Sequence, residues 1–115
     1  MTHRAPVSDF SRRIMFNRTW DLLGNRWKFY IVYLLADGPM RFGQLCRHCS
    51  AVSRPTFTAC LRALEQEGFL ERRILEGNAL AVEYRLAPLG QSAAPCVVSL
   101  VEWGFREEPE TEEAR

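Results

Sequence analysis

Two kinds of side chain in this sequence are suited to chemistry: arginines, which bind anions, and cysteines, which bind metals or respond to oxidants. Of the 15 basic residues, all except Lys28 are arginine. The planar guanidinium group makes forked contacts with phosphate and with the edge of guanine. The basic residues therefore raise the question of nucleic-acid binding first.

The charge is unevenly distributed, although the net charge of the chain is only +1. Residues 1–75 hold 12 basic and 6 acidic side chains, a balance of +6, whereas residues 76–115 hold 3 and 8, a balance of −5. Such asymmetry favours a basic face for a polyanion and an acidic end. A solvated surface without a partner explains the charge count equally well.

The cysteines offer one cluster of metal-ligand types, the Cys-Arg-His-Cys segment 46–49. A structural zinc site needs four ligands, and His48 between the two cysteines points elsewhere on a helix. We therefore expect no metal site. Cys60 and Cys96 are most simply small core residues. In a chain with a good core and no export signal, the four cysteines are expected to be reduced.

A redox function would need a lowered thiol pKa. Cys49 is expected at a helix C-terminus, where the helix dipole disfavours the thiolate, whereas the neighbouring Arg47 favours it. The two effects oppose each other, so the sequence does not decide whether this thiol is reactive.

The parts of a common enzyme active site are missing from the sequence. There is no glycine-rich phosphate loop and no nucleophile elbow, and His3 and His48 are the only histidines. We expect no catalysis and no cofactor. A group of aromatic residues could line a ligand pocket near a dimer interface, but a packed core is the favoured explanation. These residues are Trp20, Trp27, Phe29, Tyr30 and Trp103.

The size of the chain limits what can position these side chains. With 115 residues, 47% of them hydrophobic, it is expected to form one domain with its own core. No apolar run reaches the roughly 20 residues of a membrane span, and the first residues lack an apolar leader, so we expect a cytoplasmic protein. Residues 1–12 are expected to be a flexible arm, and residues 106–115, with five glutamates, a disordered acidic tail.

Between these ends, apolar periodicity and turn residues predict three helices, a fourth longer helix, a β-hairpin and a final helix. They are expected at residues 14–23, 26–36, 42–49, 53–67, 69–75 with 80–87, and 88–105. Helix 26–36 is apolar all round, and we expect a second subunit to cover it. Residues 40–42 are expected to form a short extended piece, and Pro95 a kink in the final helix.

The longer helix has well-defined ends and sides. Ser53 is a suitable N-cap and Gly68 a suitable stop. Phe57, Leu61 and Leu64 share one side, which predicts a buried stripe. The opposite side is expected to face outward and holds Pro55, Thr58, Ala59, Arg62 and Gln66.

The order of elements is typical of a winged helix-turn-helix. The fold class is therefore expected to be α+β and mostly helical, with a two-stranded wing. In such a fold, one helix presents the next to the ~12 Å major groove of DNA. A hairpin that carries arginines then reaches the adjacent phosphates or minor groove.

Five segments, in this order and spacing, resemble the HxlR-type winged helix-turn-helix transcriptional regulators. They are 20–27 (WDLLGNRW), 41–45 (RFGQL), 61–72 (LRALEQEGFLER), 82–90 (VEYRLAPLG) and 102–104 (EWG).

The resemblance implies that residues 13–105 form the domain of a bacterial DNA-binding regulator. It implies a homodimer built through the first and last helices. Helix 53–67 would then read the major groove of a pseudo-palindromic operator, with the wing, residues 70–86, on flanking DNA.

The sequence departs from this family in three places. Pro55 and Ala59 stand where members usually carry basic residues, and residues 78–81 replace a Pro-Pro-Arg-like stretch in the wing. Many members also have a redox-sensing cysteine ahead of the first helix, whereas none precedes Cys46 here. Two alternatives stay open: a protein-interaction module with weakened DNA binding, and a thiol-based redox-sensing regulator. A small-molecule effector is a further conceivable partner.

The candidate DNA contacts come from three elements of this arrangement. Arg54 and Thr58 lie near a helix start, where backbone N–H groups also favour phosphate. Glu71 and Glu83 are expected to neutralise part of the wing. The complete set is Ser53, Arg54, Thr56, Thr58 and Arg62 on the longer helix, Arg41, Gln44 and Arg47 on the preceding one, and Arg72, Arg73 and Arg85 on the wing.

Overall fold

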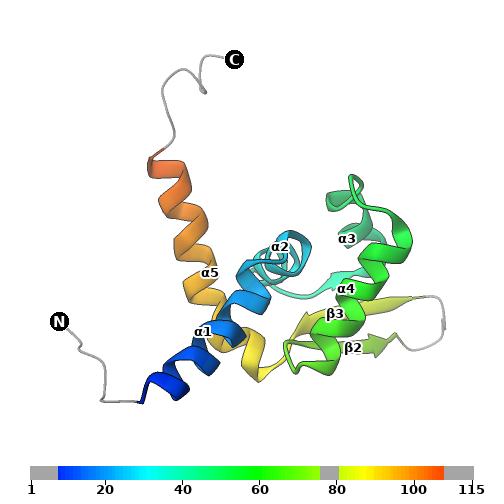
Figure 1. Ribbon diagram of the computed structural model, residues 1–115. Coiled ribbons are helices and arrows are strands. Elements are labelled where there is room, and N and C mark those ends of the chain that lie inside the picture. The colour runs from blue at the N-terminus through cyan, green and yellow to red at the C-terminus, as the bar shows by residue number, and fades with distance from the viewer. Residues whose placement is uncertain (1–7, 76–80, 108–115) are drawn as a thin grey trace.

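The computed structural model describes residues 8–75 and 81–107. Within them the elements are α1 (Asp9–Leu23), α2 (Arg26–Leu35), β1 (Met40–Arg41), α3 (Phe42–His48), α4 (Arg54–Gln66), β2 (Leu70–Ile74), β3 (Val82–Leu86) and α5 (Pro88–Arg106). Helices α3 and α4 and the hairpin lie on one side of the molecule, and α1 and α5 extend from the other (Figure 1). This order confirms the α+β, mostly helical winged helix-turn-helix.

The first helix begins at Asp9, earlier than the apolar pattern predicts, and takes in the end of the expected arm. The Ser8 side chain accepts a hydrogen bond from the Ser11 backbone N–H at 3.1 Å. Asp9 lies in the first turn, where a negative charge complements the helix dipole. A cap and polar helix formers therefore extend the helix without any apolar period. The rest of the expected arm, residues 1–7, and most of the expected tail, residues 108–115, lie outside the described residues.

The sheet has three strands in the described residues, in the order β1-β3-β2, and not the two expected. The wing strands β2 and β3 pair antiparallel, with Leu70 opposite Leu86. The expected extended piece pairs with the other side of β3, where Met40 lies opposite Tyr84. A strand of two residues is too short to give a period of its own, which explains why the sequence did not predict its pairing.

Helix α2 is packed on several sides by its own chain, while Trp27, Tyr30 and Tyr33 stay half-buried, so the expected cover by a second subunit stays a prediction. Helices α1, α4 and α5 and strand β3 all pack against it. Ile31, Val32 and Leu35 are buried as a result. Because several elements surround one central helix, an apolar residue on any of its sides finds a neighbour within the domain.

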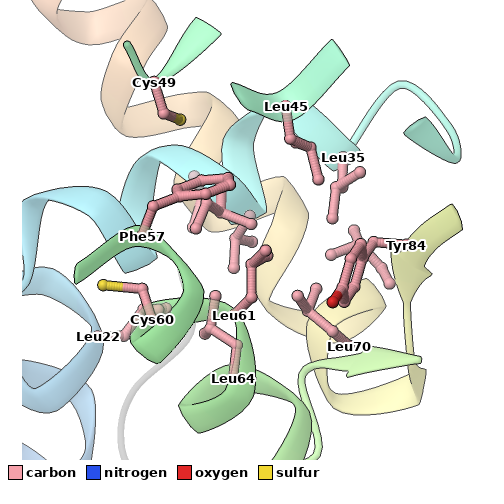
Figure 2. Close-up of a cluster of buried hydrophobic side chains, with 14 of the residues drawn as sticks. Leu22, Leu35, Leu45, Cys49, Phe57, Cys60, Leu61, Leu64, Leu70 and Tyr84 are labelled. Carbon is pink, nitrogen blue, oxygen red and sulfur yellow. The ribbon is translucent and has the colours of Figure 1, made fainter. Parts of the chain in front are cut away.

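The core fixes the orientation of α4. Phe57, Leu61 and Leu64 are almost completely buried, which confirms the predicted stripe, and Ser53 caps the helix as expected. These side chains meet Leu45 of α3 and further apolar residues from α2 and the sheet (Figure 2). Burial of a large apolar side chain contributes about 1.5–3 kcal/mol, so rotation of α4 about its axis would be costly. The opposite side of α4 is therefore held outward.

Three residues expected in the core are instead exposed. Trp20 and Trp103 are 57% and 56% exposed, and Cys96 is also exposed. Trp20 and Trp103 belong to a surface on α1 and α5 that is rich in large apolar residues, which we call the α1–α5 apolar surface. It comprises Phe10, Ile14, Met15, Phe16, Trp20, Leu23, Leu100, Trp103 and Phe105.

Candidate nucleic-acid interface

The start of α4 is fixed by local hydrogen bonds. The Thr56 backbone N–H donates to Ser53 Oγ at 3.3 Å, and Ser53 Oγ donates to Thr56 Oγ1 at 2.9 Å. Pro55 in the first turn has a φ angle suited to a helix start. Ser53 and Thr56 are both exposed, but their hydroxyl groups are engaged with each other and with the helix end. Their role in the structure is to shape the end that faces outward.

Arg54 is exposed at this helix start. Its guanidinium carbon lies 5.4 Å from the centre of the Phe42 ring, a cation–π contact between α4 and α3. The contact limits the motion of the arginine and leaves its N–H donors available at the outer edge. Arg54 is therefore held beside a helix N-terminus, whose dipole favours anions.

Further along α4, Thr58 and Arg62 face a cleft between α4 and the sheet. This cleft, which we call the α4–sheet cleft, has a volume of about 390 Å³. Its walls are formed by Phe42, Thr58, Arg62, Glu65, Arg72, Val82 and Tyr84. The structure thus places Arg72 of strand β2 and Arg62 of helix α4 in the walls of the same cleft. Tyr84 and Glu65 were not among the predicted site residues, because an alternating strand and a polar helix face give no sign of a shared cleft.

The α3 candidates lie together around a second hollow of about 420 Å³. Arg41 and Arg47 are exposed on its rim. The Gln44 side chain accepts a hydrogen bond from the Arg41 backbone N–H at 2.9 Å, so its carbonyl oxygen caps α3. Only the amide nitrogen of Gln44 is left to donate to a phosphate oxygen.

The wing arginines have different surroundings on the two faces of the hairpin. Arg85 and Glu71 form an ion pair with a 2.9 Å N–O distance, as expected for a neutralised wing position. Arg73 is exposed and lies across from Glu83 in the strand register. Arg72, on the face that turns to α4, lies opposite Tyr84 in the strand register, and its charge opposes the rise in the Tyr84 pKa that burial causes. Arg72 and Arg85 therefore do not act at one place.

The two buried thiols, Cys49 and Cys60, are poorly disposed to react. Burial, followed by the neighbouring Cys46 and Cys60, raises the pKa of Cys49 from 9.0 to about 11. Burial also raises the pKa of Cys60, against the opposing effects of Lys28 and of a contact to Asn25. Cys49 caps the C-terminus of α3 as expected. In residues 8–75 and 81–107 no three metal-ligating side chains lie close enough to hold a metal ion.

Comparisons with known proteins agree with this geometry. Residues 22–112 match the model of the HxlR-like helix-turn-helix family. An HTH-type transcriptional regulator of Bacillus subtilis, YybR, is 34% identical over 86 residues, which are 75% of this chain and 69% of that protein. Another, from Halalkalibacterium halodurans, is 35% identical over 92 residues, covering 79% of this chain and 81% of that one.

Among solved structures, the redox regulator HypR in its oxidized form superposes with a TM-score of 0.75 and 31% identity. The superposition covers 82% of this chain and 97% of that chain. As for membranes, none of the helices in the described part of the chain is both long and apolar enough to span one.

Proposed function

The chain belongs to the HxlR-like helix-turn-helix family of DNA-binding transcriptional regulators, and from that premise we propose that it acts as a homodimer on a pseudo-palindromic operator. In each subunit α4 enters the major groove, and the β2–β3 hairpin lies on flanking DNA. One observation carries the proposal. Helix α4 is anchored by a buried stripe and turns outward Arg54 and Arg62, which have no ion-pair partner among the described residues.

The proposed dimer forms through the α1–α5 apolar surface. Nine large apolar side chains there are at least 37% exposed. Between the two helices lies an apolar groove of about 330 Å³. Large exposed apolar side chains gathered on two helices of a small domain indicate an interface, and a second copy supplies a matching set by symmetry. We expect the two α4 helices of the dimer to be about 34–36 Å apart, one turn of DNA.

The test is a gel-shift titration of the purified dimer with DNA from upstream of its own gene. Retardation should weaken steeply as salt rises, because phosphate contacts release counterions. Failure to retard any genomic fragment at low salt would refute the proposal. If Arg54→Ala and Arg62→Ala change neither DNA binding nor thermal stability, the fold serves instead as a protein-interaction module.

A thiol-based sensor is the second candidate, and the similarity to HypR, which is described as a redox regulator, favours it. The burial of Cys49 counts against this candidate, because a raised pKa leaves little of the reactive thiolate near neutral pH. Treatment with diamide should change operator affinity if this candidate is correct, and Cys49→Ser should abolish the change. An unaltered affinity after diamide would reject it.

The remaining parts of the proposal concern the setting. We place the protein in the cytoplasm, without catalytic activity, and with DNA and its own second copy as partners. A small-molecule effector would act by changing the relative position of the two α4 helices. An effector screen by thermal shift, followed by the gel shift, tests this.

A further inference from the structure

The α4–sheet cleft joins two sets of residues that are far apart in the sequence. Thr58, Arg62 and Glu65 follow one another at i, i+4 and i+7, so they share the side of α4 that borders this open cleft. Arg72 and Tyr84 are directly opposite in the β2–β3 register, and both line the cleft. The fold therefore places two arginines from different elements around one opening.

Tyr84 lies on the face of the hairpin that packs against the core, as Leu70 and Leu86 do. It is only 7% exposed, and its ring belongs to the buried cluster (Figure 2). Arg72 lies directly opposite it in the strand register, and both side chains line the cleft. Because the core holds the ring, the hydroxyl group is a fixed hydrogen-bond acceptor beside the flexible arginine. A hydrogen bond from Arg72 to this acceptor would reduce the conformational entropy that Arg72 loses on binding an anion.

The charges of the cleft leave a net positive site. Arg62 and Arg72 contribute two positive charges, and Glu65 contributes one negative charge close enough to act on Tyr84. Neither arginine has an ion-pair partner in the described residues, in contrast with Arg85, which is paired with Glu71. One excess positive charge matches one singly charged phosphodiester.

We propose that the α4–sheet cleft is a binding site for one backbone phosphodiester of DNA. Arg62 and Arg72 contact the phosphate oxygens, Tyr84 is a positioning residue for Arg72, and Glu65 weakens the site. A DNA strand that passes from the major groove under α4 to the hairpin crosses this opening. The site rests on the proposed function, since it assumes that α4 and the hairpin lie on one duplex.

The experiment measures fluorescence anisotropy with two labelled duplexes, the chain's own upstream DNA and an unrelated sequence, over a series of KCl concentrations. Tyr84→Phe keeps the buried ring and removes the hydroxyl group. It should weaken both duplexes by the same factor, about three- to tenfold. Arg72→Ala should also weaken both and reduce the salt slope by about 0.9, the value for one phosphate contact.

Two further variants separate positioning from general stability. In the Arg72→Ala background, Tyr84→Phe should cause no additional loss, because its effect passes through Arg72. Glu65→Gln should strengthen binding to both duplexes and requires no loss of packing, since Glu65 is exposed. The matched control is Tyr33→Phe on α2, a half-buried tyrosine outside the cleft, which should leave affinity unchanged.

The outcomes distinguish the two proposals. If the wild-type protein binds neither duplex at low salt, the proposed function fails, and the site with it. If the wild type binds but Tyr84→Phe has no effect, or weakens binding equally with and without Arg72, the proposed site is wrong while the regulator stands. A loss confined to the upstream duplex would also overturn it, because a phosphate contact carries no sequence information.

Discussion

At the scale of single residues, the arginines differ less in exposure than in the charges beside them. Arg62 and Arg85 are both exposed, but Arg85 is held by Glu71, whereas Arg62 has only Glu65 on its own helix as a neighbouring acid in the cleft. An arginine that is already paired must lose its partner, or share it, before it binds phosphate. The position of an arginine in the fold therefore determines how available it is to phosphate, which composition alone does not show.

We predict from this ranking that Arg62→Ala weakens DNA binding by about tenfold or more, in line with a lost charge-assisted contact of 1–3 kcal/mol. Arg85→Ala is the matched control and should change affinity by less than about threefold, because the removed charge was neutralised. Anisotropy titrations of both variants check this. An equal loss of DNA affinity for the two variants would contradict this ranking. It would show that the Arg85–Glu71 ion pair breaks without cost when the protein binds DNA.

The cysteines give a second prediction at this scale. Exposed Cys96 should be alkylated by iodoacetamide first and buried Cys49 last, as followed by peptide mass spectrometry at pH 8. The pKa of Cys49 in the fold, about 11, lies above its usual 9.0, so folding favours the neutral thiol. That contribution to stability is complete below pH 9 and is lost as the pH rises towards 11.

Cys49→Ala should therefore flatten the decline of melting temperature over this alkaline range. Rapid alkylation of Cys49 at pH 8 would instead indicate that the α3 terminus opens in solution.

The sequence predicted the residues of α4 better than those of the cleft. Phe57, Leu61 and Leu64 repeat at helical spacing, and their burial follows from that repeat alone. Arg72 and Tyr84 instead depend on a strand register and on which sheet face meets α4. A tertiary contact of this kind leaves no periodic trace in the sequence.

At the scale of elements, the junction between the hairpin and α5 explains how the two halves of the molecule are joined. Gly90 in the first turn of α5 packs against the backbone at Phe69 and the side chain of Leu86. A β-carbon at Gly90 would overlap the Phe69 carbonyl oxygen, and backbone atoms cannot move aside as a side chain does. The close approach therefore sets where α5 leaves the sheet.

Gly90→Ala should accordingly lower the free energy of unfolding by about 2 kcal/mol or more. The control is Gly43→Ala in α3, where an added β-carbon meets no atom within 4 Å. That substitution should be neutral or stabilising by up to about 1 kcal/mol through helix propensity. Urea denaturation followed by circular dichroism measures both. Equal unfolding free energies for the two variants would mean that α5 moves away from Phe69 without loss of stability.

Element boundaries followed the same division between local and tertiary causes. The ends of α4 are set by the Ser53 cap and by Gly68, whose φ of +91° suits a glycine, and both were predictable from residue type. The pairing of β1 with β3 was not, because it depends on where α2 delivers the chain.

At the scale of the whole molecule, α1 and α5 carry nearly all of the large apolar side chains that the domain leaves exposed. The C-terminal part of α5 extends beyond the other elements (Figure 1). It carries Trp103 and Phe105, which are 56% and 69% exposed, and α1 contributes Phe16 and Trp20. The exposed C-terminal turns of α5 bury little apolar area within their own domain, and the dimer that we propose would cover them.

We predict that Trp103→Glu disrupts the dimer, with sedimentation equilibrium showing a dissociation constant raised by more than about tenfold. In a two-fold symmetric interface each substitution occurs twice, so the loss of one buried aromatic is counted double. The matched control is Ile74→Glu on β2, where an apolar residue of similar exposure, 54%, lies away from α1 and α5. It should leave the dimer intact.

The affinity of Trp103→Glu for the operator should fall because its subunits are separated. Two linked α4 helices bind at a high effective concentration, and separated ones do not. If instead Ile74→Glu separates the subunits and Trp103→Glu does not, the dimer is built on the wing, and the two α4 helices could not reach successive major grooves on one face of the duplex.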